Sequence, residues 1–133
     1  MAFEPKNYDS GKTASMAMAA SSTIVRFDAL AFTSWLLRRA TSSDTEVRYV
    51  ALESKTTSSG ETPEINVVRT DGVKFIADTA ANTAQANVDV YHDLTDHDTL
   101  NNAASSSDVF YWEKPFGAAA DKKLEGFFVM KTA

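Results

Sequence analysis

Short runs of β-branched and aromatic residues recur through most of this chain, broken every ~8–12 residues by turn-forming residues. The clearest case is Glu64–Asp78 (EINVVRTDGVKFIAD), in which two such runs flank Asp71-Gly72. An Asp-Gly pair supports the positive φ angles that a type I′ turn requires at both central positions. We therefore predict a β-hairpin over Glu64–Asp78, and the recurring pattern favours β-structure for the whole chain.

The same kind of run predicts the remaining strands. Candidate strands are Thr23–Phe27, Trp35–Ala40, Glu46–Glu53, Asn87–Tyr91, Asp108–Lys114 and Leu124–Lys131. For residues 28–39 a helix capped by Asp28 is the competing interpretation. Many short strands with regular turns are typical of an all-β fold, here a small antiparallel β-barrel or sandwich.

Residues 1–22 differ from the rest of the chain because they are small and polar and follow no period. Their larger apolar residues, Phe3, Tyr8, Met16 and Met18, are isolated from one another. Such a segment buries too little apolar area to fold alone. We expect an extended N-terminal arm over residues 1–22, either disordered or laid along another subunit, followed by one β-domain over residues 23–133.

Acidic residues are concentrated between Phe75 and Glu113, a stretch with seven of them and no Lys or Arg. The whole chain has 13 basic and 18 acidic residues, and its net charge of −5 argues against nucleic-acid binding. No apolar stretch approaches the ~20 residues of a spanning helix, and no signal-peptide pattern is present. We therefore expect a protein made in the cytoplasm, with neither nucleic acid nor membrane as a partner.

The best candidate for metal chemistry is the segment that holds His92 and His97 together with Asp93, Asp96 and Asp98. Imidazole and carboxylate ligands suit Zn²⁺ or Mn²⁺. However, a spacing of five residues puts the two histidines on opposite faces of a strand, and the order of residues matches no metal-binding motif. The more economical interpretation is a polar loop with capping aspartates, so we predict no metal site.

Signals for catalysis are also missing. The chain has no cysteine, no G-x-S-x-G nucleophile elbow and no glycine-rich phosphate loop. We predict that the protein is not an enzyme and uses no cofactor.

An arginine pair, Arg38-Arg39, follows Trp35 and is a candidate for protein contacts. Arginine and tryptophan are common anchors of interfaces. The alternative is that one arginine is solvated and the other forms a weak surface ion pair.

Adjacent aromatic residues in two predicted strands cannot all be buried. Phe110, Tyr111 and Trp112 follow one another, as do Phe127 and Phe128, and neighbouring strand residues point to opposite faces. Some of these rings must face outward, and a subunit contact would cover them. The residues expected at subunit contacts are Trp35, Phe110, Tyr111 and Trp112.

Five segments together resemble a known family. They are Thr23–Ala31 (TIVRFDALA), Leu36–Thr41 (LLRRAT), Thr45–Glu53 (TEVRYVALE), Gly72–Ala77 (GVKFIA) and Lys123–Val129 (KLEGFFV). In this order they resemble the small β-barrel decoration, or cement, proteins of tailed bacteriophage heads. The chain departs from that pattern at Ser34-Trp35 and at Tyr49, where many relatives carry glycine.

The resemblance implies a structural protein of the virion that binds the outer surface of the capsid and stabilises it. Its implied partners are the major capsid protein and itself, as a homotrimer. The residues expected to contact the capsid are Phe3, Tyr8, Met16, Met18, Arg38 and Arg39. The alternatives are another virion component, such as a tail-tube, head–tail joining or fibre-base protein, and a small metal- or glycan-binding module.

Overall fold

Antiparallel strands carry almost all of the regular structure in the computed structural model of the chain, which describes residues 2–84, 89–103 and 107–131. The first sheet has the order β1-β9-β14-β13-β10, with bounds Phe3–Pro5, Phe75–Asp78, Lys123–Phe128, Phe110–Pro115 and Tyr91–His92. The second sheet has the order β2-β8-β6-β4-β5, with bounds Thr13–Ala17, Glu64–Arg69, Tyr49–Ala51, Ala29–Thr33 and Leu36–Arg39.

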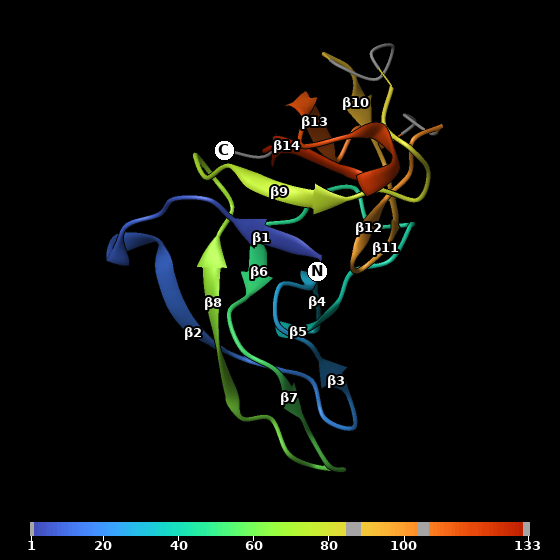
Figure 1. Cartoon of the computed structure of the whole chain (residues 1–133). Coiled ribbons are helices and arrows are strands. Elements are labelled where there is room, and N and C mark those ends of the chain that lie inside the picture. The colour runs from blue at the N-terminus through green and yellow to red at the C-terminus, as the bar shows by residue number, and fades with distance from the viewer. Residues whose placement is uncertain (1, 85–88, 104–106, 132–133) are drawn as a thin grey trace.

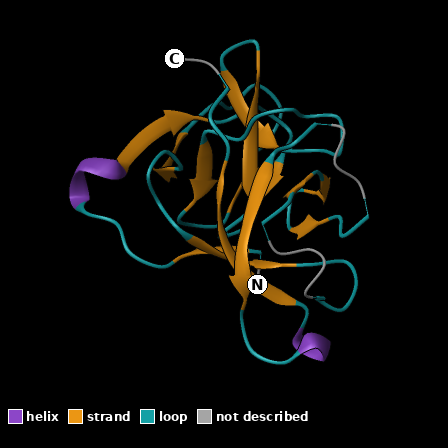
Figure 2. Cartoon of the chain, turned by 90° about the horizontal axis from the view of Figure 1, so that it is seen from above, coloured by secondary structure: helices purple, strands orange, loops and turns teal. Residues whose placement is uncertain are grey.

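Smaller elements complete the fold. Among the described residues they are the pair β3 (Thr23–Ile24) and β7 (Lys55–Thr56), the pair β11 (Leu94–Asp96) and β12 (Thr99–Leu100), and the 3-10 turns at Ser10–Lys12 and Ala119–Asp121. In Figure 1 the first sheet lies above the second, and Figure 2 shows both 3-10 turns at the periphery. The predicted all-β class is confirmed: the described strands form a sandwich-like arrangement without a closed barrel.

Most of the predicted strands are present in shortened form. The runs that begin at Thr23 and Glu46 give β3 and β6, and those near the C-terminus give β13 and β14. The strand expected over Asn87–Tyr91 begins only at Tyr91, and residues 87–88 lie outside the described part of the chain.

Residues 28–39 form strands, so the helical alternative is wrong. β4 and β5 pair from Leu30↔Arg39 to Thr33↔Leu36, and β4 also pairs with β6. Pairing on both sides of β4 satisfies the backbone groups that a helix would otherwise have satisfied internally.

The predicted hairpin over Glu64–Asp78 is also wrong: a turn is present at Asp71-Gly72, but only Gly72 has a positive φ, so the turn is not of type I′. The amide of Val73 donates to the carbonyl of Thr70 at 3.2 Å, and Gly72 has φ +72°. β8 pairs with β2 and β6, whereas β9 pairs with β1 and β14. The Asp71-Gly72 turn therefore carries the chain from the second sheet to the first.

The segment expected to be an arm belongs to both sheets of its own chain. β1 pairs with β9 through Phe3↔Ala77, and β2 pairs with β8 from Thr13↔Val68 to Ala17↔Glu64. Phe3 and Met18 are fully buried. Burying a large apolar side chain stabilises a fold by about 1.5–3 kcal/mol. The burial of Phe3 and Met18 in the domain therefore supplies the free energy that docks this segment.

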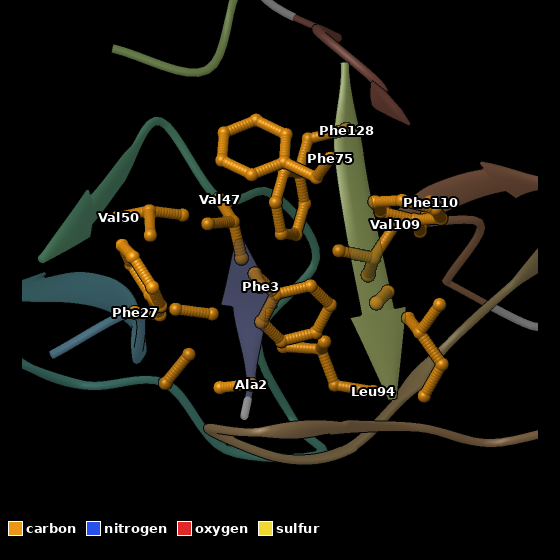
Figure 3. Close-up of a cluster of buried hydrophobic side chains, with 14 of the residues drawn as sticks. Ala2, Phe3, Phe27, Val47, Val50, Phe75, Leu94, Val109, Phe110 and Phe128 are labelled. Carbon is orange, nitrogen blue, oxygen red and sulfur yellow. The ribbon is translucent and has the colours of Figure 1, made fainter. Parts of the chain in front are cut away.

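Two clusters of buried side chains result. The larger cluster includes residues of both sheets, and Figure 3 shows Phe3 at its centre with Phe75, Phe110 and Phe128 nearby. The ring of Phe3 lies 5.0 Å from that of Phe128 and 6.0 Å from that of Phe110, measured between centroids. The smaller cluster is mostly aliphatic and consists of Met18, Ile24, Leu30, Leu37, Ala51, Ile65 and Val67.

Candidate interaction surface

The most exposed large hydrophobic side chain among the described residues is Trp35, at the tip of the β4–β5 hairpin. It is 90% exposed, and the next most exposed, Val25, is at 44%. Both turn residues have positive φ, 51° at Ser34 and 69° at Trp35. Positive φ at both positions suits a two-residue hairpin turn, but it is an unfavourable region for a bulky side chain. Ser34 and Trp35, which stand where the resembling proteins carry glycine, therefore adopt this turn at a conformational cost.

The arginines that follow Trp35 are both held by carboxylates. Arg38 donates from Nη1 and Nη2 to the two oxygens of Asp44, at 3.0 and 3.1 Å, and from Nε to Thr33 Oγ1 at 2.7 Å. Partial burial of Asp44 favours a higher pKa for its carboxyl, but the hydrogen bonds from Arg38 and Thr41 and the charge of Arg38 together outweigh it and hold that pKa below its usual range. The guanidinium of Arg38 is therefore held within its own chain by Asp44 and Thr33.

Arg39 forms an ion pair with the buried carboxylate of Asp28. Its Nε donates to Asp28 Oδ2 at 2.8 Å, and His97 Nδ1 lies 3.0 Å from Asp28 Oδ1. Next to His97, the carboxyl groups of Asp96 and Asp98 interact with each other, which raises the pKa of Asp96 and lowers that of Asp98. These contacts fix the β11–β12 turn against the start of β4, where the amide of Ala29 also donates to the carbonyl of His97 at 2.8 Å.

Aromatic rings also form a stripe on the outer face of the first sheet. Tyr111 lies between Tyr91 and Phe127, with ring centroids 5.2 and 5.0 Å away. The hydroxyl of Tyr111 donates to Asp89, which raises the pKa of the tyrosine. The stripe therefore has a polar margin on the Asp89 side.

A groove of about 470 Å³ opens beside this stripe. It is lined by Gly72, Val73, Lys74, Tyr91, Phe127, Phe128, Val129 and Met130. Its one charged lining residue, Lys74, donates to both carboxylate oxygens of Glu113 at 2.7 and 2.8 Å. The groove is otherwise an apolar surface made by the turn after β8, the edge strand β10 and the end of β14.

Three of the four residues expected at subunit contacts lie on one strand, β13, but they do not share one face of it. Phe110 and Trp112 point inward and are buried, so the expectation that they contact another subunit is wrong. Tyr111 points outward, as strand alternation requires. Trp35 and Tyr111 remain available for contacts.

The six residues expected at the capsid are dispersed. Phe3 and Met18 lie in the two clusters, so they have no surface to offer and that expectation is wrong. Met16 is half-buried against the smaller cluster, whereas Tyr8 is 42% exposed beside the first 3-10 turn. The six residues therefore do not form one continuous site.

The histidine segment is also divided. His92 is buried with its ring 4.5 Å from that of Trp112, whereas His97 contacts Asp28. Within the described ranges, no group of three or more His, Cys, Asp or Glu side chains is arranged to hold a metal ion.

Sequence reasoning missed the groove, although it required that Phe127 or Phe128 face outward. The remaining contributors, Val73 and Met130, lie far apart in the chain. Only the antiparallel pairing of β14 with β9 and β13 brings them to one place.

Comparisons with known proteins give no relative for this chain. No family model, curated protein or solved structure matches it. Among the described residues, no helix has the length and apolar character needed to cross a membrane.

Proposed function

We propose that this chain is a virion structural protein that binds the outer surface of a tailed-phage capsid and stabilises it, as a homotrimeric decoration protein. The observation that carries this proposal is Trp35, a tryptophan that is 90% exposed at the tip of the β4–β5 hairpin. A large exposed apolar side chain on a small, densely packed domain is typical of a protein whose role is to bind other proteins.

The resemblance to decoration proteins supports the same proposal, because its segments occupy the framework of the fold. Thr23–Ala31 contains β3 and the start of β4, Leu36–Thr41 contains β5, and Lys123–Val129 contains β14. Similar spacing of apolar residues in these segments would therefore specify similar strands.

In this proposal the N-terminal segment is part of the domain, whereas its sequence predicts an arm that contacts the capsid. β1 and β2 are strands of the domain itself, so the capsid contact falls to the exposed side chains beside them. Tyr8, with Met16 at the margin, is the proposed contact in this region. Arg38 and Arg39, whose side chains are each one-third exposed beside their ion pairs, are the proposed basic contacts.

The decisive experiment mixes the purified protein with capsids that lack a decoration protein, from a phage whose genome encodes this chain. We expect electron cryo-microscopy to show added density at the local threefold axes. Tyr8→Ala should lower occupancy, while Phe116→Ala, which truncates a ring of the same 42% exposure at a distant turn, should not. Tubes or rings formed by the protein alone, with no binding to capsids, would instead favour a tail-tube or head–tail joining component.

A further inference from the structure

We propose that the Asp71-Gly72 peptide is a site of spontaneous covalent modification, at which the aspartate converts to isoaspartate, and that Lys12 limits the rate of this conversion. Asp71-Gly72 is the pair that the sequence suggested as a hairpin turn, and the chain contains no other Asp-Gly and no Asn-Gly pair. The inference goes beyond the proposed function and does not depend on it, because its test uses the purified chain alone.

The conversion needs only the two residues of the pair and water. The main-chain nitrogen of Gly72 attacks the carboxyl carbon of Asp71 in its protonated form, and the amide proton leaves with the carboxyl hydroxyl as water. The product is a five-membered succinimide ring. Water then opens this ring at the side-chain carbonyl, which restores aspartate, or at the main-chain carbonyl, which gives isoaspartate. The water lost in the first step returns in the second, so the atoms balance without any other reactant.

The turn leaves the Gly72 nitrogen accessible for this attack. Both residues are exposed and lie between the end of β8 at Arg69 and the start of β9 at Phe75. The Gly72 amide donates no hydrogen bond to any residue that the structure describes, so no such bond has to break before the nitrogen reacts. Glycine has no Cβ, so the backbone around this nitrogen is open to approach and free to change conformation.

Lys12 opposes the reaction by holding the group that is attacked. Its Nζ donates to Asp71 Oδ2 at 3.1 Å and to the carbonyl oxygen of Asp71 at 2.8 Å. One ammonium group therefore fixes the side chain and the main chain of Asp71 relative to each other. Because the reacting form of the carboxyl is neutral, the reaction begins with the loss of this ion pair, and conversion is slower while Lys12 is in place.

The exposure of the ion pair sets the size of this protection. The side chain of Lys12 is 32% exposed and that of Asp71 is 55% exposed, so solvent screens their attraction. Loss of an ion pair of this kind corresponds to a change in rate of about two- to fivefold.

Isoaspartate would alter the connection between the two sheets, because it adds one methylene carbon to the main chain. Thr70 and Val73, on either side of the pair, are buried, so the added length falls on the exposed turn between them. Gly72 and Val73 line both the groove beside Tyr91 and a second groove of about 360 Å³ beside Tyr8. The modification therefore changes the surface where the two grooves meet.

The first test follows isoaspartate in the full chain, kept folded at physiological temperature and mildly acidic pH. Trypsin cleaves after Arg69 and Lys74, so residues 70–74 are released as one peptide in which electron-transfer fragmentation distinguishes the two isomers. We expect isoaspartate to accumulate in this peptide, about two- to fivefold faster in Lys12→Met than in the wild type, and faster still in urea.

Two outcomes would overturn the proposal. Absence of isoaspartate from residues 70–74 of both the folded wild type and Lys12→Met, after a time in which half of the urea-denatured chain has converted, would show that this turn is not a site of modification. Equal rates in the folded wild type and Lys12→Met would show that Lys12 gives no protection.

Two control variants separate the ion pair from a general effect of charge. Lys12→Arg keeps a cationic donor and should convert at close to the wild-type rate. Lys55→Met removes the same charge from β7, which lies at the opposite end of β8 from Asp71 in Figure 1, and should also convert like the wild type. A rate in Lys55→Met as high as that in Lys12→Met would refute the role of Lys12.

The last measurement tests the effect of the modification on the fold. Protein that is aged until most of its residues 70–74 contain isoaspartate should unfold at a lower temperature than fresh protein. An unchanged unfolding temperature would contradict the effect on the connection between the sheets.

Discussion

The two buried clusters of this protein are built from different side chains and from different parts of the chain. The larger is rich in aromatic rings and includes residues from Ala2 to Phe128. The smaller is aliphatic, apart from half-buried Tyr49 at its margin, and its buried members come only from residues 18–67. The larger cluster joins the two ends of the chain, whereas the smaller one stabilises the second sheet.

This difference assigns separate tasks to the two sheets. The second sheet holds the Trp35 hairpin, and its aliphatic cluster lies under β4 and β5. The first sheet holds the groove, and its inner face packs on the aromatic cluster. The relative placement of hairpin and groove therefore depends on the larger cluster, which the N-terminal Phe3 completes.

The largest expected effect is on the larger cluster. Phe3→Ala should lower the free energy of unfolding by about 3–5 kcal/mol, because it leaves a cavity among packed rings. Urea denaturation followed by circular dichroism measures this change. Phe116→Ala, on an exposed phenylalanine, should change stability by no more than about 0.5 kcal/mol. Equal effects of the two variants would mean that residues 3–5 do not dock on the domain.

The smaller cluster should respond less. Leu37→Ala should cost about 2–4 kcal/mol, and Leu36→Ala, on the half-buried neighbour in the same strand, should cost clearly less. Hydrogen exchange sharpens the comparison: Leu37→Ala should speed exchange of amides in β4 and β5 more than in β13 and β14. Uniform acceleration in both sheets would show that the clusters unfold as one unit.

Acid should weaken an ion pair that holds the N-terminal segment to the first sheet. Lys6 Nζ donates to the buried Glu125 at 2.8 Å, and this hydrogen bond lowers the pKa of Glu125. Since folding lowers that pKa, the carboxylate stabilises the fold above pH ~4.5 and loses this effect as the pH falls through its folded pKa.

Glu125→Gln measures that contribution. The variant should lose about 1 kcal/mol at pH 7, where Lys6 is partly screened by solvent, and should lose less stability than the wild type on acidification. Asp44→Asn tests the equivalent ion pair with Arg38 on the second sheet. Parallel pH profiles for the wild type and Glu125→Gln would contradict the role of Lys6.

The smallest effect should be a gain. Replacing Ser34-Trp35 by Asn-Gly should raise stability by about 0.5–1 kcal/mol, because it relieves positive φ at a bulky residue. The unfolding temperature measures the gain. A loss of stability would mean that the indole packs on its own chain, and would remove the argument that Trp35 serves another molecule.

Local patterns predicted the elements better than their partners. The apolar runs at Glu64–Arg69 and Phe75–Asp78 are strands, and Asp71-Gly72 is a turn, yet the hairpin between them does not exist. An Asp-Gly pair reports the local backbone, whereas the choice of neighbour depends on which sheet buries each strand. β8 buries Ile65 in the smaller cluster and Val68 in the larger, and its two edges pair with β2 and β6 rather than with β9.

For the candidate site, too, local patterns predicted single residues better than the residues that lie beside them. Trp35 was predicted from sequence as a contact residue because of its type and its neighbours, and the structure shows that its side chain is 90% exposed. Phe110 and Trp112 were assigned to the wrong face because strand alternation gives two faces without saying which is buried. The groove was not predictable, since its lining joins residues 72–74, 91 and 127–130.

By itself, the sequence determined the all-β class, the positions of most strands and the concentration of acidic residues between Phe75 and Glu113, because period, turn chemistry and charge are local properties. Only the tertiary structure decided that the N-terminal segment belongs to the domain. Phe3 and Met18 are isolated in sequence, and their burial depends on residues as distant as Phe128 and Leu37. The free energy that docks them comes from contacts that no local pattern contains.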